Sequence, residues 1–61
     1  ADEMKVRGGD DLTIEAVKDG TVEVYSLTGA IVARVKVSRG FTTVNLPMGI
    51  YIVAGQKVTI D

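Results

Sequence analysis

Hydrophobic and polar residues alternate along most of this chain. From residue 11 onward the alternation has a period of two, which is typical of strands that bury one face. The stretch Ile50–Val53 is apolar at every position, which predicts a central strand covered on both faces. The other inward-facing rows that the pattern predicts are Leu12-Ile14-Ala16, Val22-Val24, Ile31-Ala33-Val35-Val37, Thr42-Val44-Leu46 and Val58-Ile60.

Turn-forming residues separate these stretches at short intervals. Lys18-Asp19-Gly20 predicts a hairpin turn, because Asp-Gly tolerates the positive φ angles of tight hairpins. Gly40 is expected in the left-handed region at the end of a three-residue loop. Further turns are predicted at Leu27–Ala30, Leu46–Gly49 and Ala54–Gln56.

The composition agrees with this pattern of strands. Valine, isoleucine and threonine together make up 21 of the 61 residues, and branching at Cβ suits a pleated strand. Short strands with two apolar faces to bury need two layers, so the sequence predicts an all-β fold, a small antiparallel β-sandwich of five to seven short strands. An open barrel is the alternative architecture.

The polar N-terminus sets the expected domain boundary. Residues 1–10 are predicted to be a linker that ends at Gly8-Gly9-Asp10, with a short strand at Met4–Arg7 as an option. Residues 11–61 are predicted to form a single domain. A chain of this size buries only about 60% of its unfolded surface, and without cysteine or histidine it has no obvious disulfide or zinc to stabilise it.

The charges exclude several classes of partner. The net charge is −1, with basic and acidic residues mixed along the chain, so nucleic acid is not an expected partner. The longest apolar run, Ile50–Ala54, is far shorter than the ~20 residues of a membrane span. We expect a monomer.

No arrangement for catalysis stands out. Histidine and cysteine are absent, and the only Ser–Lys pair with a shared face, Lys36 with Ser38, is expected on a solvated surface. Asp10, Asp11 and Asp19 fit turns and strand starts, and they lack the alternate spacing of a calcium loop. The sequence therefore predicts a protein that is not an enzyme and has no cofactor or metal.

One ordered set of motifs remains. Val22-x-Val24-Tyr25-x-Leu27-x-Gly29 is followed by Leu46-Pro47-x-Gly49-x-Tyr51-x-Val53 and then by Lys57-Val58-x-Ile60. This order resembles the C-terminal sorting domains of the type IX secretion system of Bacteroidota, and the short relatives that end secreted proteins of gut members of that phylum. The resemblance covers about residues 11–60.

The resemblance implies an immunoglobulin-like sandwich at the end of a larger secreted or surface protein. Such domains reach the cell surface through the periplasm, are recognised by the outer-membrane translocon and are removed by a sortase. It also implies partners among the secretion machinery or the parent protein's other domains. The candidate sorting-motif residues are Gly29, Gly49, Tyr51 and Lys57, and the last strand, Lys57–Ile60, is expected at a sheet edge open to a receptor strand.

Each candidate residue also has a structural explanation. Gly29 and Gly49 can permit turns, Tyr51 can fill the core with its hydroxyl at the rim, and Lys57 can protect an edge strand. The alternative function is a structural or adhesive surface module. If that module binds carbohydrate, Tyr25 and Phe41 are the aromatic residues expected on its exposed binding face.

Overall fold

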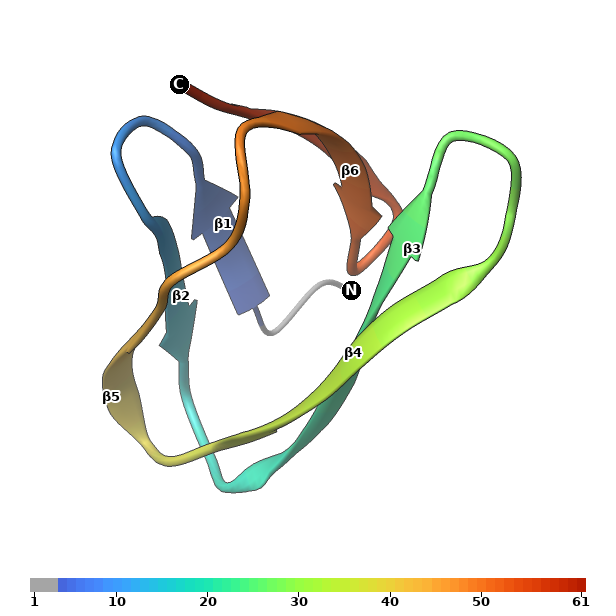
Figure 1. Ribbon diagram of the computed structural model, residues 1–61. Helices are drawn as coiled ribbons and strands as arrows, with labels where there is room; N and C mark the ends of the chain where they lie inside the picture. The colour runs from blue at the N-terminus through green and yellow to red at the C-terminus, as the bar shows by residue number, and fades with distance from the viewer. Residues whose placement is uncertain (1–3) are drawn as a thin grey trace.

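The computed structural model describes residues 4–61, which form seven strands and, in that range, no helix (Figure 1). Every pairing between named strands is antiparallel. The strands are β1 (Met4–Arg7), β2 (Leu12–Ala16), β3 (Gly20–Ser26), β4 (Ile31–Val37), β5 (Gly40–Val44), β6 (Gly49–Val53) and β7 (Gln56–Ile60).

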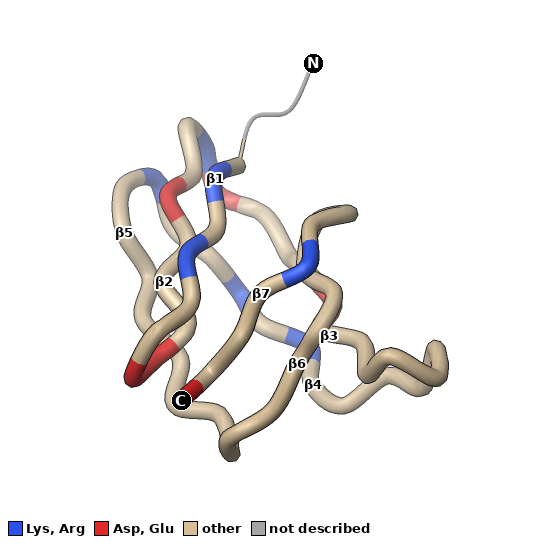
Figure 2. The backbone as a smooth tube through the Cα atoms, turned by 90° about the horizontal axis from the view of Figure 1, so that it is seen from above, with Lys and Arg blue, Asp and Glu red and all other residues tan. Residues whose placement is uncertain are grey.

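The strands form two sheets. One sheet has three strands in the order β1-β2-β5, and the other has four in the order β4-β3-β6-β7. Figure 2 shows the two sheets as separate layers, with β2 and β5 on one side and β3, β4 and β6 on the other. The predicted all-β sandwich is therefore confirmed.

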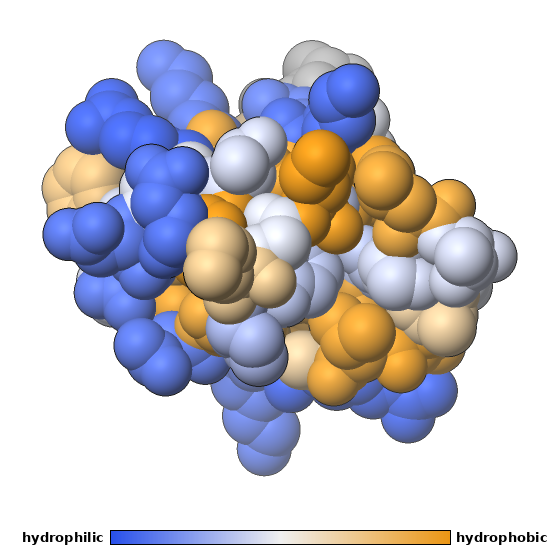
Figure 3. Space-filling model, turned by 45° about the horizontal axis from the view of Figure 1, so that its top comes forward, coloured by the Kyte–Doolittle hydropathy of each residue, from blue (hydrophilic) through white to orange (hydrophobic). Residues whose placement is uncertain are grey.

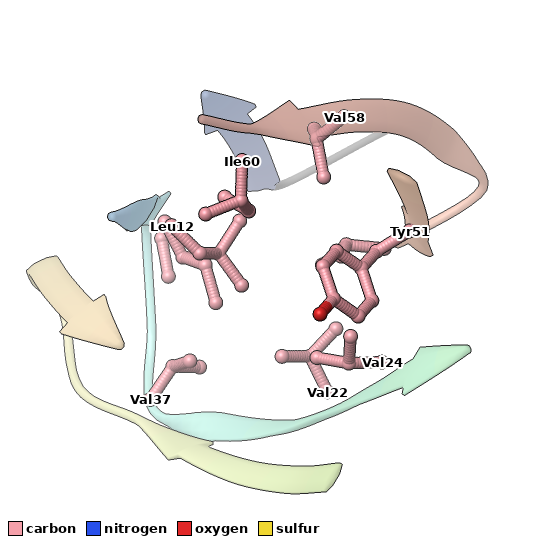
Figure 4. Close-up of a cluster of buried hydrophobic side chains, with 10 residues drawn as sticks. Leu12, Val22, Val24, Val37, Tyr51, Val58 and Ile60 are labelled. Carbon is pink, nitrogen blue, oxygen red and sulfur yellow. The ribbon is translucent and has the colours of Figure 1, made fainter. Parts of the chain in front are cut away.

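The core between the sheets is built by alternate residues of both layers. Its largest fully buried side chains are Leu12, Ile14, Val24, Val53 and Ile60. Figure 4 shows these inner-face side chains meeting in one cluster, completed by Ala16, Val22, Val37, Tyr51 and Val58. The rows predicted for residues 12–16, 22–24 and 58–60 are confirmed, because period-two patterning places alternate side chains on one face of a strand.

The chain turns back within one sheet at some connections and crosses between sheets at others. The turns at residues 27–30 and 54–56 close the hairpins β3–β4 and β6–β7. The hairpin predicted at Lys18–Gly20 is wrong, because β2 and β3 belong to different sheets and this segment crosses from one to the other. A hydrogen bond of 3.0 Å from the Arg39 amide to Asp19 Oδ1 ties this crossing to the one between β4 and β5.

The N-terminal segment belongs to the domain from Met4 onward. Residues Met4–Arg7 form β1, which pairs with β2 along its whole length, so the linker predicted for residues 1–10 is wrong over residues 4–10. The optional strand at Met4–Arg7 is the correct interpretation. Residues 1–3 lie outside the described residues, so the linker prediction stays open there.

Two predicted rows are less buried than their patterns suggest. β6 lies between β3 and β7, but Ile50 is 41% exposed, so this central strand is covered on one face only. In the row predicted for residues 31–37 only Val37 is buried, and Ile31 is 47% exposed. The cause is position, because β4 is an edge strand with a bulge, where Tyr25 pairs with Ile31 directly after Val24 pairs with Ala33.

Candidate interaction surface

Tyr51 has a structural role in the corner between β5 and β6. Its ring is buried on the inner face of the four-stranded sheet and points toward Val22 and Val24 of the neighbouring strand β3 (Figure 4). Its hydroxyl donates a hydrogen bond of 2.6 Å to the carbonyl oxygen of Pro47, four residues upstream. This arrangement is the tyrosine corner known from β-sandwiches, and it fixes the crossing from the three-stranded to the four-stranded sheet.

Gly49 belongs to the same corner. Its φ is +156°, near the limit of the region that favours glycine, and a Cβ there would lie 3.6 Å from the Tyr51 hydroxyl oxygen. That distance is an ordinary van der Waals contact, so the space beside the ring is close to filled. Gly49 and Tyr51 are thus brought together by the fold, and the Tyr51 hydrogen bond stabilises the corner.

Gly29 lies apart from that corner, in the turn of the β3–β4 hairpin. Its φ of +92° is a conformation that side chains rarely adopt, so the turn requires glycine. Its amide donates to the Ser26 carbonyl oxygen at 3.0 Å, and the Ser26 amide donates to the Ala30 carbonyl oxygen at 2.8 Å. These bonds close the hairpin, which extends away from the body of the domain (Figure 1).

Lys57 lies on β7, on the outer face of the four-stranded sheet. It pairs with Ile52, and its side chain is exposed. Within residues 4–61 the Lys57 side chain forms no hydrogen bond or ion pair. Of the four candidate residues, Lys57 alone carries a charged group, and that group is exposed.

The strand that carries Lys57 lies at a sheet edge, but a second segment covers part of that edge. The Gly9 amide donates to the Thr59 carbonyl oxygen at 3.0 Å, and the Asp61 amide donates to the Gly9 carbonyl oxygen at 2.8 Å. Gly8 lies so close to the Thr59 carbonyl that a Cβ at residue 8 would overlap it. We call Gly8-Gly9 the strap. It covers the free hydrogen-bonding edge of β7 from Thr59 onward.

An exposed apolar surface lies on the outer side of the four-stranded sheet. Tyr25 pairs with Ile31 on one side and with Ile52 on the other, and Ile50 follows two residues from Ile52 on the same face. We call these four residues the apolar face. In Figure 3 hydrophobic residues gather toward the β3–β4 hairpin at the right, whereas hydrophilic residues cover the left side. Contiguous exposed apolar surface of this kind marks interaction sites.

The charges around the apolar face are mainly basic. Its sheet carries Arg34, Lys36 and Lys57 but only one acid, Glu23, on the outer side. That is a net charge of +2 from three basic residues and one acidic residue, against −1 for the whole chain. The face therefore favours a partner with acidic groups around an apolar centre.

A small polar network joins the apolar face to its charged border. The Tyr25 hydroxyl donates to Glu23 Oε1 at 2.6 Å, and Arg34 Nε donates to Glu23 Oε2 at 3.0 Å. The bond from Tyr25, followed by the Arg34 guanidinium, lowers the pKa of Glu23 below its ordinary value. The same carboxylate raises the pKa of Tyr25, because ionising the phenol would break the bond and place two negative charges together.

The outer face of the three-stranded sheet is different in character. A shallow groove there is lined by Lys5, Val6, Arg7, Thr13, Glu15 and Phe41. Phe41, 73% exposed, pairs with Glu15, whereas Tyr25 lies on the opposite side of the sandwich. The two aromatic residues expected on a single carbohydrate-binding face therefore do not share a face.

Sequence reasoning missed two parts of this surface. It offered a short strand at Met4–Arg7 but placed Lys5 and Arg7 in a linker outside the domain, and it did not predict that this strand joins the three-stranded sheet. It also gave no sign that β4 is an edge, since alternation reports which face is buried and not which neighbours a strand has.

Within residues 4–61, no group of three acidic side chains is placed to hold a metal ion, and no helix is long and apolar enough to cross a membrane. Comparison of the chain with protein-family models, curated proteins and solved structures gives no match.

Proposed function

We propose that this chain is a non-catalytic sorting module of a larger exported protein, recognised by the secretion machinery that delivers the parent to the cell surface or beyond it. The observation that carries the proposal is the apolar face, where Ile31 and Ile50 stay exposed in the folded domain and the exposed Lys57 lies at the border. A domain whose task is to be recognised needs such a surface, because apolar area buried on binding supplies most of the favourable free energy.

The motif residues support this proposal in two different ways. Gly29, Gly49 and Tyr51 shape the hairpin and the corner that hold the four-stranded sheet in place. Lys57 extends the apolar face with a charge at its border. The motif would therefore specify a recognisable sheet, and the contacts themselves would come from the side chains on its outer surface.

The test is export of a reporter that carries this domain at its C-terminus in a bacterium with a type IX secretion system. Ile50→Asp and Ile52→Asp place a charge on the apolar face and should reduce export at least about tenfold, if that face is buried on recognition. Phe41→Asp is the matched control, because it changes an exposed apolar residue on the opposite outer face. Circular dichroism establishes that each variant is folded.

Two results would contradict the sorting proposal: folded Ile50→Asp and Ile52→Asp variants that are exported normally, or a Phe41→Asp variant that fails equally. Removing residues 57–61 is a poorer test. That deletion takes the buried Val58 and Ile60 out of the core, so loss of export would follow from unfolding alone.

The second candidate function is an adhesive module that binds carbohydrate. It is favoured by the groove on the three-stranded sheet, where the exposed Phe41 ring stands beside the charged Lys5, Arg7 and Glu15. Binding to a glycan array that disappears in Phe41→Ala and persists in Tyr25→Ala would favour this function over sorting. Equal loss in both variants would exclude the groove as the glycan site.

A further inference from the structure

The four-stranded sheet has a second edge, β4, which is its longest exposed edge strand. β4 spans seven residues and pairs only with β3 within the described part of the chain. Its sequence, Ile-Val-Ala-Arg-Val-Lys-Val, is rich in β-branched residues. An edge strand presents unpaired backbone groups, and it is a template for another strand unless something covers it.

The hydrogen bonds of the β3–β4 hairpin show which backbone groups face the open side. Ser26 both donates to and accepts from the turn that leads into β4. Backbone N–H and C=O groups alternate in direction along a regular strand. Those of Val22 and Val24 therefore also point toward β4, where they face Val35 and Ala33. On β4, Arg34 lies between Ala33 and Val35, and Lys36 follows Val35. The backbone amides and carbonyls of Arg34 and Lys36 therefore point to the open edge.

The side chains of β4 define what an added strand would meet. Ala33 and Val35 are half-buried at the rim of the core, so their inner sides stay partly uncovered. Arg34 and Lys36 project from the outer face. Arg34 forms an ion pair with Glu23, whereas Lys36 forms no ion pair within residues 4–61.

These features disfavour a second copy of the chain. Two β4 edges placed together would bring Arg34 and Lys36 of each copy against one another, and like charges on neighbouring strands are destabilising. The bulge opposite Tyr25 further limits pairing between two identical edges. The same charges attract a strand that carries acidic residues on its outer face.

From this arrangement we infer that the open edge of β4 accepts an extended peptide segment of a partner protein, in which acidic and apolar residues alternate. The segment adds as a fifth strand to the sheet. Its backbone pairs with the outward groups of Arg34 and Lys36, its apolar residues cover Ala33 and Val35, and its carboxylates face the two basic side chains. The inference goes beyond the proposed function, since it concerns the isolated domain and holds whether or not export depends on this edge.

The test uses the 61-residue domain and a capped synthetic peptide of alternating glutamate and valine. Addition of the peptide to the ¹⁵N-labelled domain should shift the amide signals of Arg34 and Lys36 and slow the hydrogen exchange of those amides. A peptide with lysine in place of glutamate should bind at least about tenfold more weakly, because its charges repel those of β4.

Two variants make the test specific. Lys36→Pro removes one outward amide without touching the β3–β4 bonds, so it should abolish peptide binding and leave the spectrum of the core intact. Lys57→Pro is the matched control, because it removes an outward amide from the part of β7 that the strap leaves uncovered, at the opposite edge of the sheet.

Several results would overturn the inference: no binding of the glutamate peptide, equal binding of the lysine peptide, or shifts confined to β5 or β7. Unchanged binding by Lys36→Pro would do the same. Signals of β4 that shift with protein concentration before peptide is added would make a second copy the occupant.

Discussion

The two edges of the four-stranded sheet, β7 and β4, have opposite designs. β7 buries Val58 and Ile60 in the core, and the strap covers its free hydrogen-bonding edge from Thr59 onward. β4 is longer and buries only Val37. Within the described chain, no strand pairs with its second backbone edge. β7 therefore contributes to the core and has part of its edge covered, whereas the edge of β4 is free to pair with another strand.

This difference changes which edge a receptor strand would use. The last strand was expected to be the open edge, and β7 does lie at the end of its sheet. Its backbone is nevertheless engaged by Gly9 at both Thr59 and Asp61. A strand added to β7 would have to displace the strap, whereas one added to β4 would displace only water.

The largest expected effect is the difference in stability loss between truncating a buried residue of β7 and truncating an exposed residue of β4. Ile60→Ala removes a side chain that is 1% exposed, and should lower the free energy of unfolding by about 2–5 kcal/mol. Ile31→Ala on β4 changes a side chain that is 47% exposed, and should cost at most about 0.5 kcal/mol. Urea denaturation of both variants measures the difference, and similar losses would remove the distinction between the edges.

A smaller effect is expected when the strap is disturbed. Gly8→Ala forces the strap away from the Thr59 carbonyl, and should destabilise the domain by about 1–3 kcal/mol. Gly20→Ala is the control, because a Cβ there meets only the Met4 methyl group at 3.7 Å. If Gly8→Ala proves as stable as Gly20→Ala in thermal unfolding, the strap does not hold β7.

The hydrogen bond of Tyr51 at the corner should contribute less to the free energy of unfolding than the strap does. Tyr51→Phe keeps the ring and removes the bond to Pro47, which should cost about 0.5–1.5 kcal/mol. Tyr25→Phe, on the partly exposed outer face, removes the bond to Glu23 and should cost less than Tyr51→Phe. Chemical denaturation compares the two variants. A greater loss in Tyr25→Phe would show that the network beside β4 stabilises the domain more than the corner does.

The smallest effect is expected from the titration of Glu23 beside β4. Its pKa is lowered by Tyr25 and Arg34, so its contribution to stability is present above its unfolded pKa and is lost as pH falls through the lower folded value. Tyr25 behaves in the opposite sense, and its contribution is lost as pH rises through its raised pKa. Both groups are accessible to solvent, so the changes in stability should be small. NMR titration of Glu23 in wild type and Tyr25→Phe checks the acidic limb, and an unchanged Glu23 pKa in the variant would contradict the assigned cause.

The sequence predicted the interior of the fold better than its borders. Rows such as Leu12-Ile14 and Val58-Ile60 were predictable because a period of two in apolar residues reports burial of one face. The same signal cannot distinguish a central strand from an edge, which is why Ile31 and Ile50 were expected to be more buried than they are.

The turn at Gly29 and the core position of Tyr51 were predictable from the sequence, whereas the surfaces around them were not. The spacing of Pro47 and Tyr51 was the available signal for a tyrosine corner, since the hydroxyl must reach a carbonyl a few residues upstream. The strap could not be predicted, because Gly8-Gly9 meets Thr59 only after both sheets have formed. The open edge of β4 depends equally on the order of strands in the sheet.

Hydrogen exchange at individual backbone amides tests the contrast between the two edges most directly. The amides of Gly9 and Asp61 each donate a hydrogen bond between the strap and β7, so they should exchange slowly, near the rate of the core. The amides of Arg34 and Lys36 should exchange rapidly in the free domain. Slow exchange at Arg34 and Lys36 together with rapid exchange at Gly9 and Asp61 would show that β7, and not β4, is the available edge.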